Sequence, residues 1–487
     1  MNASLYIKDI RTMLFSSTIF IFLFLPLTFI LYYNPIFKGR GLKNIVLFLA
    51  SLFFYAWGEP VYILLLLIAS ALTWLFGILL GKNALAPLPL RRRHRKFILI
   101  IAVTFLVGLL TIFKYASFVF LQLTYIHINV PQINITLPIG ISFYVFQMLS
   151  YIFDVYYEKV PFEKNYLNVA LYVVLFPQLV AGPIVRYNTI ADEILNRKET
   201  LEDFELGIKR FVIGLGKKAL IADVLGANAD AIFNSCAVAN VGAITAWIGA
   251  ISYTLEIYYD FSAYSDMAIG LGRCFGFHFP ENFNYPYIST SITDFWKRWH
   301  MSLTDWFRDY VYIPMGGNRV SRYRHICNIT IVWILTGIWH GANWTFLIWG
   351  MVYCLFQILE RFVYDVKILP KCLRLFYTMF IVNMCWVLFR VDNISMFFKY
   401  VLSMFGRYGF LDINSLTYLR MSWIIFTISC IGCTPFLKRL YRILIGKSAY
   451  LRDITIVFEY IILIGILIMT VCTSISQGYS PFIYFNF

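Results

Sequence analysis

Long stretches without a charged side chain recur along this chain and decide what it can fold into. The first covers residues 14–37, and further apolar runs cover 44–58, 61–80, 97–113, 137–153, 375–389, 421–437 and 460–472. Several approach the roughly 20 residues that a helix needs to cross about 30 Å of hydrocarbon. In lipid only helices or closed barrels satisfy the backbone, and these runs lack the period-two alternation of barrel strands. The sequence therefore predicts an all-α, polytopic membrane protein.

Basic residues are grouped in short blocks between the apolar runs, at 91–96, at Lys209, Arg210, Lys217 and Lys218, and at 438–442. Such blocks mark cytoplasmic loops, so the net charge of +15 indicates a membrane topology rather than nucleic-acid binding. With the first block inside, we expect the N-terminus outside. The spacing predicts about 11 or 12 crossings, with re-entrant and interfacial pieces, in one integral unit over residues 1–487.

Three segments are not simple crossings. The segment FPQLVAGPIVRY at 176–187 contains prolines and a glycine, and it is expected to be broken or re-entrant, which lipid tolerates only where the backbone is buried in protein or lines a wet cavity. The basic, partly apolar pattern of residues 204–225 predicts a helix that lies at the membrane interface. After a span at 237–259, residues 261–277 are rich in small side chains, which let helices approach closely.

The cysteines and histidines give no metal-binding pattern. The nine cysteines lie mostly in apolar stretches and are expected to be buried thiols. Cys430 and Cys433 form one CxxC with no second pair, and no HExxH occurs. We therefore expect no metal site and no bound cofactor.

Two histidines lie in tryptophan-rich surroundings. On a helical wheel, the charged side chains from Asp294 to Asp309 fall on one face and the aromatic ones on the other, which predicts an amphipathic helix with His300 at the edge of its apolar side. His340 lies 16 residues beyond Arg324, or roughly 24 Å along a helix. It lies in an uncharged stretch, 326–359, that is expected to form two short spans with a break near Gly341.

These two histidines are candidates for proton transfer. An imidazole with a pKa near 6.5 moves protons readily at neutral pH, and a polar side chain in lipid needs a partner or a purpose. The simpler alternatives are an interhelical hydrogen bond for His340 and an interfacial anchor for His300. Asp260 and Asp266 border an apolar run and are further candidates, the alternative being helix-end contacts with arginines such as Arg273.

Seven motifs, taken in order, carry a family resemblance. PYISTSITDFWKRWHMSL (286–303) and WILTGIWHGANWTFLIWG (333–350) resemble the paired signature of the membrane-bound O-acyltransferase family. Five further matches are SLFFYAWGEP (51–60), LPIGISFYVFQMLSYIFDVY (137–156), FPQLVAGPIVRY (176–187), YYDFSAYSDMAIGLGRCFGF (258–277) and SPFIYFNF (480–487). The chain resembles the bacterial alginate O-acetyltransferase branch more than the shorter branch that D-alanylates teichoic acids. Only the dozen residues before Met13 are unlike the usual start of the family.

The resemblance implies the fold, the site and the reaction. It implies a helical bundle with a catalytic core at about 137–360 and a funnel in which His340 matches the catalytic histidine and His300 the second one. We expect His340 to act as general base and His300 to position substrate or stabilise developing charge. The further candidate substrate contacts are Trp339, Asn343, Trp296 and Asp260.

The implied protein is a bacterial inner-membrane enzyme. It would move an acetyl group from a cytoplasmic thioester, acetyl-CoA or a carrier protein's phosphopantetheine arm, toward hydroxyls of an exported polysaccharide such as alginate. An extracytoplasmic SGNH-type acetyltransferase is the implied partner. Alternatives of the same class are peptidoglycan O-acetylation and D-alanyl transfer, and alternatives of other classes are a transporter for polysaccharide or lipid-linked intermediates and a scaffold for a synthase.

Overall fold

The computed structural model describes residues 13–83, 88–128, 130–131, 135–477 and 482–483, so the residues before Met13 lie outside it. The described residues form helices and connecting loops without a β-strand, which confirms the predicted all-α class. The described residues divide into two compact units, one of those within 13–211 and 264–280 and the other of those within 212–263 and 281–483. A single integral unit with a core at 137–360 stays a prediction.

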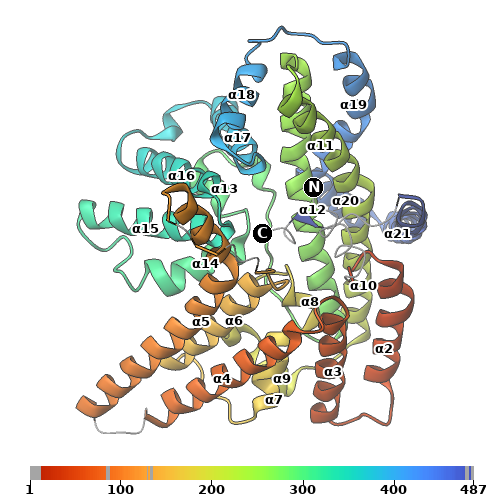
Figure 1. The fold of residues 1–487 in the computed structure, drawn as a ribbon. Coiled ribbons are helices and arrows are strands. Elements are labelled where there is room, and N and C mark those ends of the chain that lie inside the picture. The colour runs from red at the N-terminus through yellow and green to blue at the C-terminus, as the bar shows by residue number, and fades with distance from the viewer. Residues whose placement is uncertain (1–12, 84–87, 129, 132–134, 478–481, 484–487) are drawn as a thin grey trace. The chain divides into compact units, whose positions relative to one another are not determined.

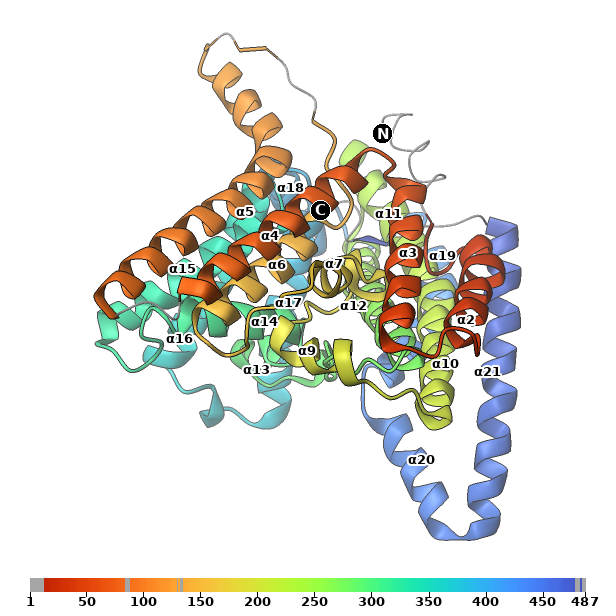
Figure 2. The same cartoon turned by 90° about the horizontal axis from the view of Figure 1, so that it is seen from below.

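The first unit contains the helices at the red-to-yellow end of the chain in Figure 1. They are η1 (Phe20–Phe24), α2 (Leu25–Tyr33), α3 (Arg40–Gly58), α4 (Tyr62–Lys82), α5 (Leu88–Tyr125), α6 (Ile141–Tyr156), α7 (Tyr166–Val174), α8 (Phe176–Leu179), α9 (Tyr187–Asn196) and most of α10 (Leu201–Gly216). The last turns of α12 (Ala243–Cys274) also belong to it. α4, α5 and α6 pack against one another (Figures 1 and 2).

The centre of the first unit is α6 with the broken segment that follows α7. Nearly every residue of α6 is buried, and so are the residues from Phe176 to Val185. Only four residues of that segment are helical, and groups at both of its ends are satisfied within the protein, since the Phe176 N–H donates to Ser51 Oγ at 3.0 Å and the Val185 carbonyl accepts from the Tyr172 hydroxyl at 2.8 Å. The predicted broken helix at 176–187 is confirmed, and burial in protein explains how its irregular backbone is accommodated.

Small residues bring two helices of the first unit into backbone contact. A Cβ on Gly270 of α12 would lie 2.5 Å from the Gly207 carbonyl oxygen of α10 and 2.8 Å from the Phe211 nitrogen. The close approach predicted for the segment 261–277 is therefore confirmed at Gly270. In lipid such contacts replace the hydrophobic effect as the source of helix association.

The second unit contains the remaining helices. They are η3 (Lys217–Ala222), α11 (Asp223–Val238), the first part of α12, η4 (Pro286–Ile288), α13 (Ile292–Trp296), α14 (Met301–Phe307), η5 (Arg308–Tyr312), α15 (Arg322–His340), α16 (Trp344–Phe362), η6 (Val366–Ile368), α17 (Lys371–Arg390), α18 (Ile394–Met404), α19 (Ser415–Gly432), α20 (Phe436–Lys447) and α21 (Ala449–Gln477). α15 and α16 pack closely, and α20 and α21 form a hairpin (Figure 2).

Aromatic rings fill the core of this unit where α13, α15, α16 and α17 meet. The Trp296 ring lies 5.0 Å from Trp333 and 5.6 Å from Trp349, measured between centroids, and Trp349 lies 6.1 Å from Trp386. Rings at these separations add stabilisation beyond the burial of their area.

Seven of the described helices are long and apolar enough to cross a membrane. They are Arg40–Gly58, Tyr62–Lys82, Arg92–Tyr125, Trp344–Phe362, Lys371–Arg390, Ser415–Gly432 and Ala449–Ser476. The expected 11 or 12 crossings also included shorter or more charged helices such as α6 and α12, which these criteria of length and composition leave out. The first run, expected over 14–37, is helical in Phe20–Tyr33 and ends before the Asn34–Pro35 pair, because the residue before a proline is biased away from helix.

The expectation of an interfacial helix at 204–225 is wrong at Lys218. This side chain is buried, and its ammonium group lies 2.7 Å from Asp260 Oδ1 and 2.8 Å from Asp223 Oδ1. Burial without partners would make such a charge very costly, so the two carboxylates explain why it is not at a headgroup surface.

We expect Gly270→Ala to destabilise the protein. The added methyl group would overlap backbone atoms of α10, which, unlike a side chain, cannot move away by changing rotamer. Overpacking of this kind typically costs about 1–3 kcal/mol. Gly465→Ala on α21 is the matched control, since a Cβ there meets nothing within 4 Å. Thermal unfolding of both variants in the same detergent checks this, and equal melting temperatures would contradict the close contact.

Candidate active site

His340 is the last residue of α15, beside a helix break. The break predicted near Gly341 is confirmed, and a Cβ at Gly341 would meet the Phe346 ring at 2.4 Å. Asn343 caps α16, because its side-chain oxygen accepts from the Thr345 N–H at 3.1 Å and its Nδ2 donates to the Asp392 carbonyl at 2.9 Å. The break therefore results from a small residue followed by a capping residue.

The His340 imidazole lies among aromatic rings. It is 3% exposed, and its ring centroid lies 4.8 Å from Trp349, 5.1 Å from Trp339 and 5.3 Å from Phe389. These rings come from α15, α16 and α17, so three helices fix the imidazole. An environment of this kind excludes bulk water from the ring.

His300 occupies a backbone conformation that breaks the expected amphipathic helix. The continuous helix over 294–310 is wrong, because His300 has φ 43° and separates α13 from α14. A left-handed residue other than glycine is strained and is often held at a functional site. The side chain is 0% exposed and contacts Phe261 with ring centroids 4.7 Å apart. His300 is therefore a buried residue and not an interfacial anchor.

Asn282 fixes the orientation and tautomer of His300. The backbone N–H of Ser302 and its hydroxyl approach Asn282 Oδ1 at 3.3 and 2.9 Å, which identifies that atom as the acceptor oxygen. His300 Nδ1 lies 3.0 Å from the same oxygen, so Nδ1 carries the proton and Nε2 keeps its lone pair. Burial lowers the pKa of His300 to about 3, and the ring is neutral at pH 7.

Trp339 joins the two histidines. Its ring centroid lies 6.1 Å from that of His300 and 5.1 Å from that of His340, and it is 5% exposed. The structure thus brings together three of the residues chosen from the sequence. Trp296 belongs to the same aromatic cluster through Trp349, whereas Asn343 is engaged in capping α16.

Asp260 is held by groups of the second unit. One carboxylate oxygen pairs with Lys218, and the other accepts from the Ile483 N–H at 2.8 Å. Asp266 pairs with Arg210 at 2.8 Å. The expected contact with an arginine is therefore confirmed for Asp266, whose partner is Arg210, and is wrong for Asp260, whose partner is Lys218. A substrate contact of Asp260 stays a prediction.

A cavity of about 550 Å³ lies beside the aromatic cluster, along α15. Its lining runs from His325 to Thr336 on that helix, roughly 16 Å at 1.5 Å per residue. Thr336 precedes His340 by one helical turn. The walls are largely apolar and include Trp296, Trp333 and Ile329. This lining fits an extended ligand, and His340 itself is not among the lining residues.

The electrostatics of the cavity are positive. Lys297 and Arg361 line it and have no carboxylate partner in the described part of the chain, whereas Arg308 is paired with Asp305. Burial and the nearby Arg361 guanidinium lower the pKa of His325, so that ring adds no charge at neutral pH. Two uncompensated cations favour an anionic ligand group at this cavity.

Comparison with known proteins identifies the chain. A family model described as the membrane-bound O-acyltransferase family matches residues 163–405. The probable alginate O-acetylase AlgI of Pseudomonas putida is 36% identical over 98% of this chain and 100% of its own length. The chain belongs to the membrane-bound O-acyltransferase family. It is therefore a multi-pass membrane enzyme that transfers acyl groups, as its motifs indicated.

Two further relatives are similar over most of their lengths. The probable alginate O-acetylase AlgI of Pseudomonas aeruginosa is 40% identical over 81% of this chain and 75% of its own length. The peptidoglycan O-acetyltransferase of Helicobacter pylori is 33% identical over 83% of this chain and 82% of its own length.

Sequence reasoning missed four residues that surround the two candidate histidines. Asn282 lies 18 residues before His300 in an irregular stretch, where no periodicity predicts which side chains meet. Phe389 and Phe261 reach the histidines only through the tertiary fold. Trp349 lies within the motif at 333–350, but the motif alone gave it no role. Among the described residues, no group of three metal-binding side chains is found, and the absence of a metal site stays a prediction.

We expect Asn282→Leu to remove the single-tautomer state of His300, because the acceptor for Nδ1–H is lost. Nitrogen-15 solid-state spectra of histidine-labelled protein should show Nδ1 protonated and Nε2 unprotonated in the native chain, and a tautomer mixture in the variant. His300→Gln identifies which nitrogen signals belong to His300. Asn228→Leu is the control, because it removes an unrelated hydrogen bond to Ser422. An unchanged His300 signal in Asn282→Leu would contradict the assignment.

Proposed function

We propose that this enzyme transfers an acetyl group from a cytoplasmic thioester toward hydroxyls of an exported polysaccharide. The observation that carries the proposal is the buried His340 at a helix break, within one turn of an elongated, positively charged cavity. The printed names of the relatives support the acetyl group and the acceptor class, since two of them are alginate O-acetylases and one acts on peptidoglycan.

His340 is proposed as the general base. It takes the proton of the acceptor hydroxyl while that oxygen attacks the thioester carbonyl, and a tetrahedral intermediate forms. Collapse of the intermediate expels the thiolate, which recovers the proton from the imidazolium. Burial among aromatic rings supports this step, because a water-free site protects the thioester from hydrolysis.

His300 is proposed to position the acceptor. Its Nε2 lone pair accepts a hydrogen bond, because Nδ1–H is directed to Asn282. In this tautomer Nε2 can accept a hydrogen bond from a hydroxyl group but cannot donate one to an oxyanion. The indole N–H groups of Trp349 and Trp296 are buried and find no acceptor within the described chain, which makes them candidate donors to the developing negative charge.

The cavity along α15 is proposed as the donor site. Lys297 and Arg361 would hold the phosphates of coenzyme A, or of the phosphopantetheine arm of a carrier protein, while the apolar walls take the arm itself. The thioester would then lie near Thr336, one turn from His340. The positive charge and elongated shape support an anionic, narrow donor over a neutral one.

The proposal also covers the membrane, the partner protein and the final acceptor. We propose that the enzyme lies in a bacterial inner membrane and passes acetyl groups to an extracytoplasmic SGNH-type acetyltransferase, with alginate or a similar exopolysaccharide as final acceptor. The relative from Helicobacter pylori favours peptidoglycan as the second candidate acceptor. A D-alanyl donor on a carrier protein is the alternative for the same cavity.

Loss of the base should abolish acyl transfer. We expect His340→Ala in nanodiscs to lower transfer from radiolabelled acetyl-CoA by about 10²–10⁴-fold, the usual contribution of general-base catalysis. His300→Ala should lower it less, mainly by raising the KM for acceptor. Variants are compared at matched thermal stability, and His94→Ala is the control because that exposed histidine lies far along the chain from either site residue.

Full activity of His340→Ala would exclude this histidine as the base. Export of polysaccharide that survives the loss of His340 would favour a transporter. Absence of donor binding by the native protein, with candidate partners present, would favour a scaffold.

The donor site makes a separate prediction. We expect Arg361→Ala to raise the KM for acetyl-CoA roughly tenfold with little change in kcat, because a cation lost from a phosphate contact weakens binding by about 1–1.5 kcal/mol. Lys371→Ala removes an exposed cation that does not line the cavity and should leave KM unchanged. A rise in KM of similar size in both variants would show a general charge effect.

A further inference from the structure

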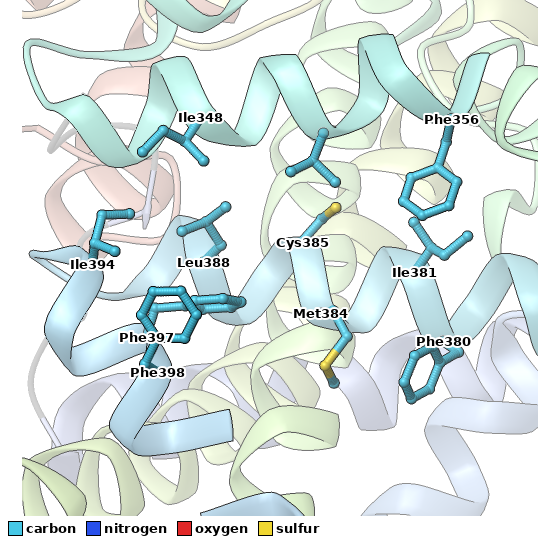
Figure 3. A pocket seen from close by; sticks show the side chains of 11 residues that line it. Ile348, Phe356, Phe380, Ile381, Met384, Cys385, Leu388, Ile394, Phe397 and Phe398 are labelled. Atoms are coloured by element: carbon cyan, nitrogen blue, oxygen red, sulfur yellow. The ribbon is translucent and has the colours of Figure 1, made fainter. Parts of the chain in front are cut away.

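A second cavity, of about 340 Å³, lies in the second unit between α16, α17 and α18. Figure 3 shows Ile348 and Phe356 of α16 facing Ile381, Cys385 and Leu388 of α17, with side chains of α18 at one end. The eleven lining residues are Ile348, Val352, Phe356, Phe380, Ile381, Met384, Cys385, Leu388, Ile394, Phe397 and Phe398. Apart from the Cys385 thiol and the weakly accepting Met384 thioether, none of these side chains can form a hydrogen bond.

The cavity has a buried floor and an exposed rim. On α17, Ile381 is 6% exposed, Cys385 1% and Leu388 3%. At the rim, Ile348 is 39% exposed and Phe398 60%. Both α16 and α17 are long and apolar enough to cross a membrane, so the rim is continuous with their lipid-facing surfaces. Molecules of the bilayer can thus enter without crossing water.

The lining decides what kind of ligand fits. Water needs two to four polar partners, and apolar cavities of smaller size stay dry and take up apolar molecules. Inside a bilayer the hydrophobic effect adds nothing, but a void still lacks the dispersion contacts that a filling group supplies. The uncharged lining matches hydrocarbon and excludes a headgroup or a sugar.

We propose that this cavity binds one acyl chain of a bilayer phospholipid. Phospholipid is the occupant favoured by position, because the rim opens on the surface that membrane-spanning helices present to lipid. Its headgroup would stay outside, beyond the rim, and only the chain would reach the floor at Cys385 and Leu388.

The proposed lipid acyl chain would lie close to His340, the candidate base. On α16, Ile348 lines the cavity and the next residue, Trp349, packs on His340; on α17, Leu388 lines it and the next residue, Phe389, packs on His340. An acyl chain would therefore pack against residues adjacent in sequence to the two rings that hold the imidazole. This makes lipid part of the support of the site.

The test is photolabelling in nanodiscs of phosphatidylethanolamine and phosphatidylglycerol, doped with phosphatidylglycerol that carries a diazirine midway along one acyl chain. Mass spectrometry of the labelled peptides should find adducts on the buried floor residues, Ile381, Cys385 and Leu388. Lipid that only surrounds the protein reaches exposed side chains such as Leu355, which is 53% exposed and does not line the cavity. Labels confined to exposed residues would overturn the proposal.

Variants and a competitor complete the design. Val352→Trp fills the cavity and should abolish floor labelling, whereas Met351→Trp, on the exposed neighbour outside the lining, should preserve it. Floor labelling that persists in Val352→Trp at native thermal stability would contradict the proposal. Displacement of the label by unlabelled polyprenyl phosphate but not by excess phospholipid would assign the cavity to a lipid-linked intermediate and overturn the phospholipid assignment.

Discussion

Burial of two imidazoles in an apolar bundle is the constraint on which the second unit depends. Each ring removed from water must be held by the protein itself, and the chain does this in two different ways. His300 is oriented by one amide oxygen and an unusual backbone conformation, whereas His340 is enclosed by rings from three helices. The aromatic cluster is thus both core and site wall, and packing and chemistry share the same residues.

Breaks in the helices place these groups. α15 stops at His340 because Gly341 and the capping Asn343 follow, and α13 ends at Trp296, so that the left-handed His300 begins the next helix, α14. The irregular segment after α7 in the first unit is buried in the same way. Each break frees backbone groups that lipid cannot satisfy, and each is tolerated because protein surrounds it.

Much of the fold followed from local sequence. Long apolar runs predicted the helices, and proline, glycine and small residues predicted the broken segment at 176–187, the break at Gly341 and the close contact at Gly270. The wheel over 294–310 failed because periodicity cannot detect one residue with φ 43°. Asn282 was missed for a related reason, since side-chain partners 18 residues apart in irregular chain are set by the tertiary fold.

Trp339 touches both histidines, and this has a consequence for how their energies combine. Residues that share a partner usually show coupling of about 0.5–3 kcal/mol, so the effects of changing them separately do not sum to the effect of changing them together. The indole ring thus couples the imidazole proposed as base to the one proposed to position the acceptor. Rotation of that single ring would alter both environments at once, and natural variation at position 339 would then be expected to accompany changes around both histidines.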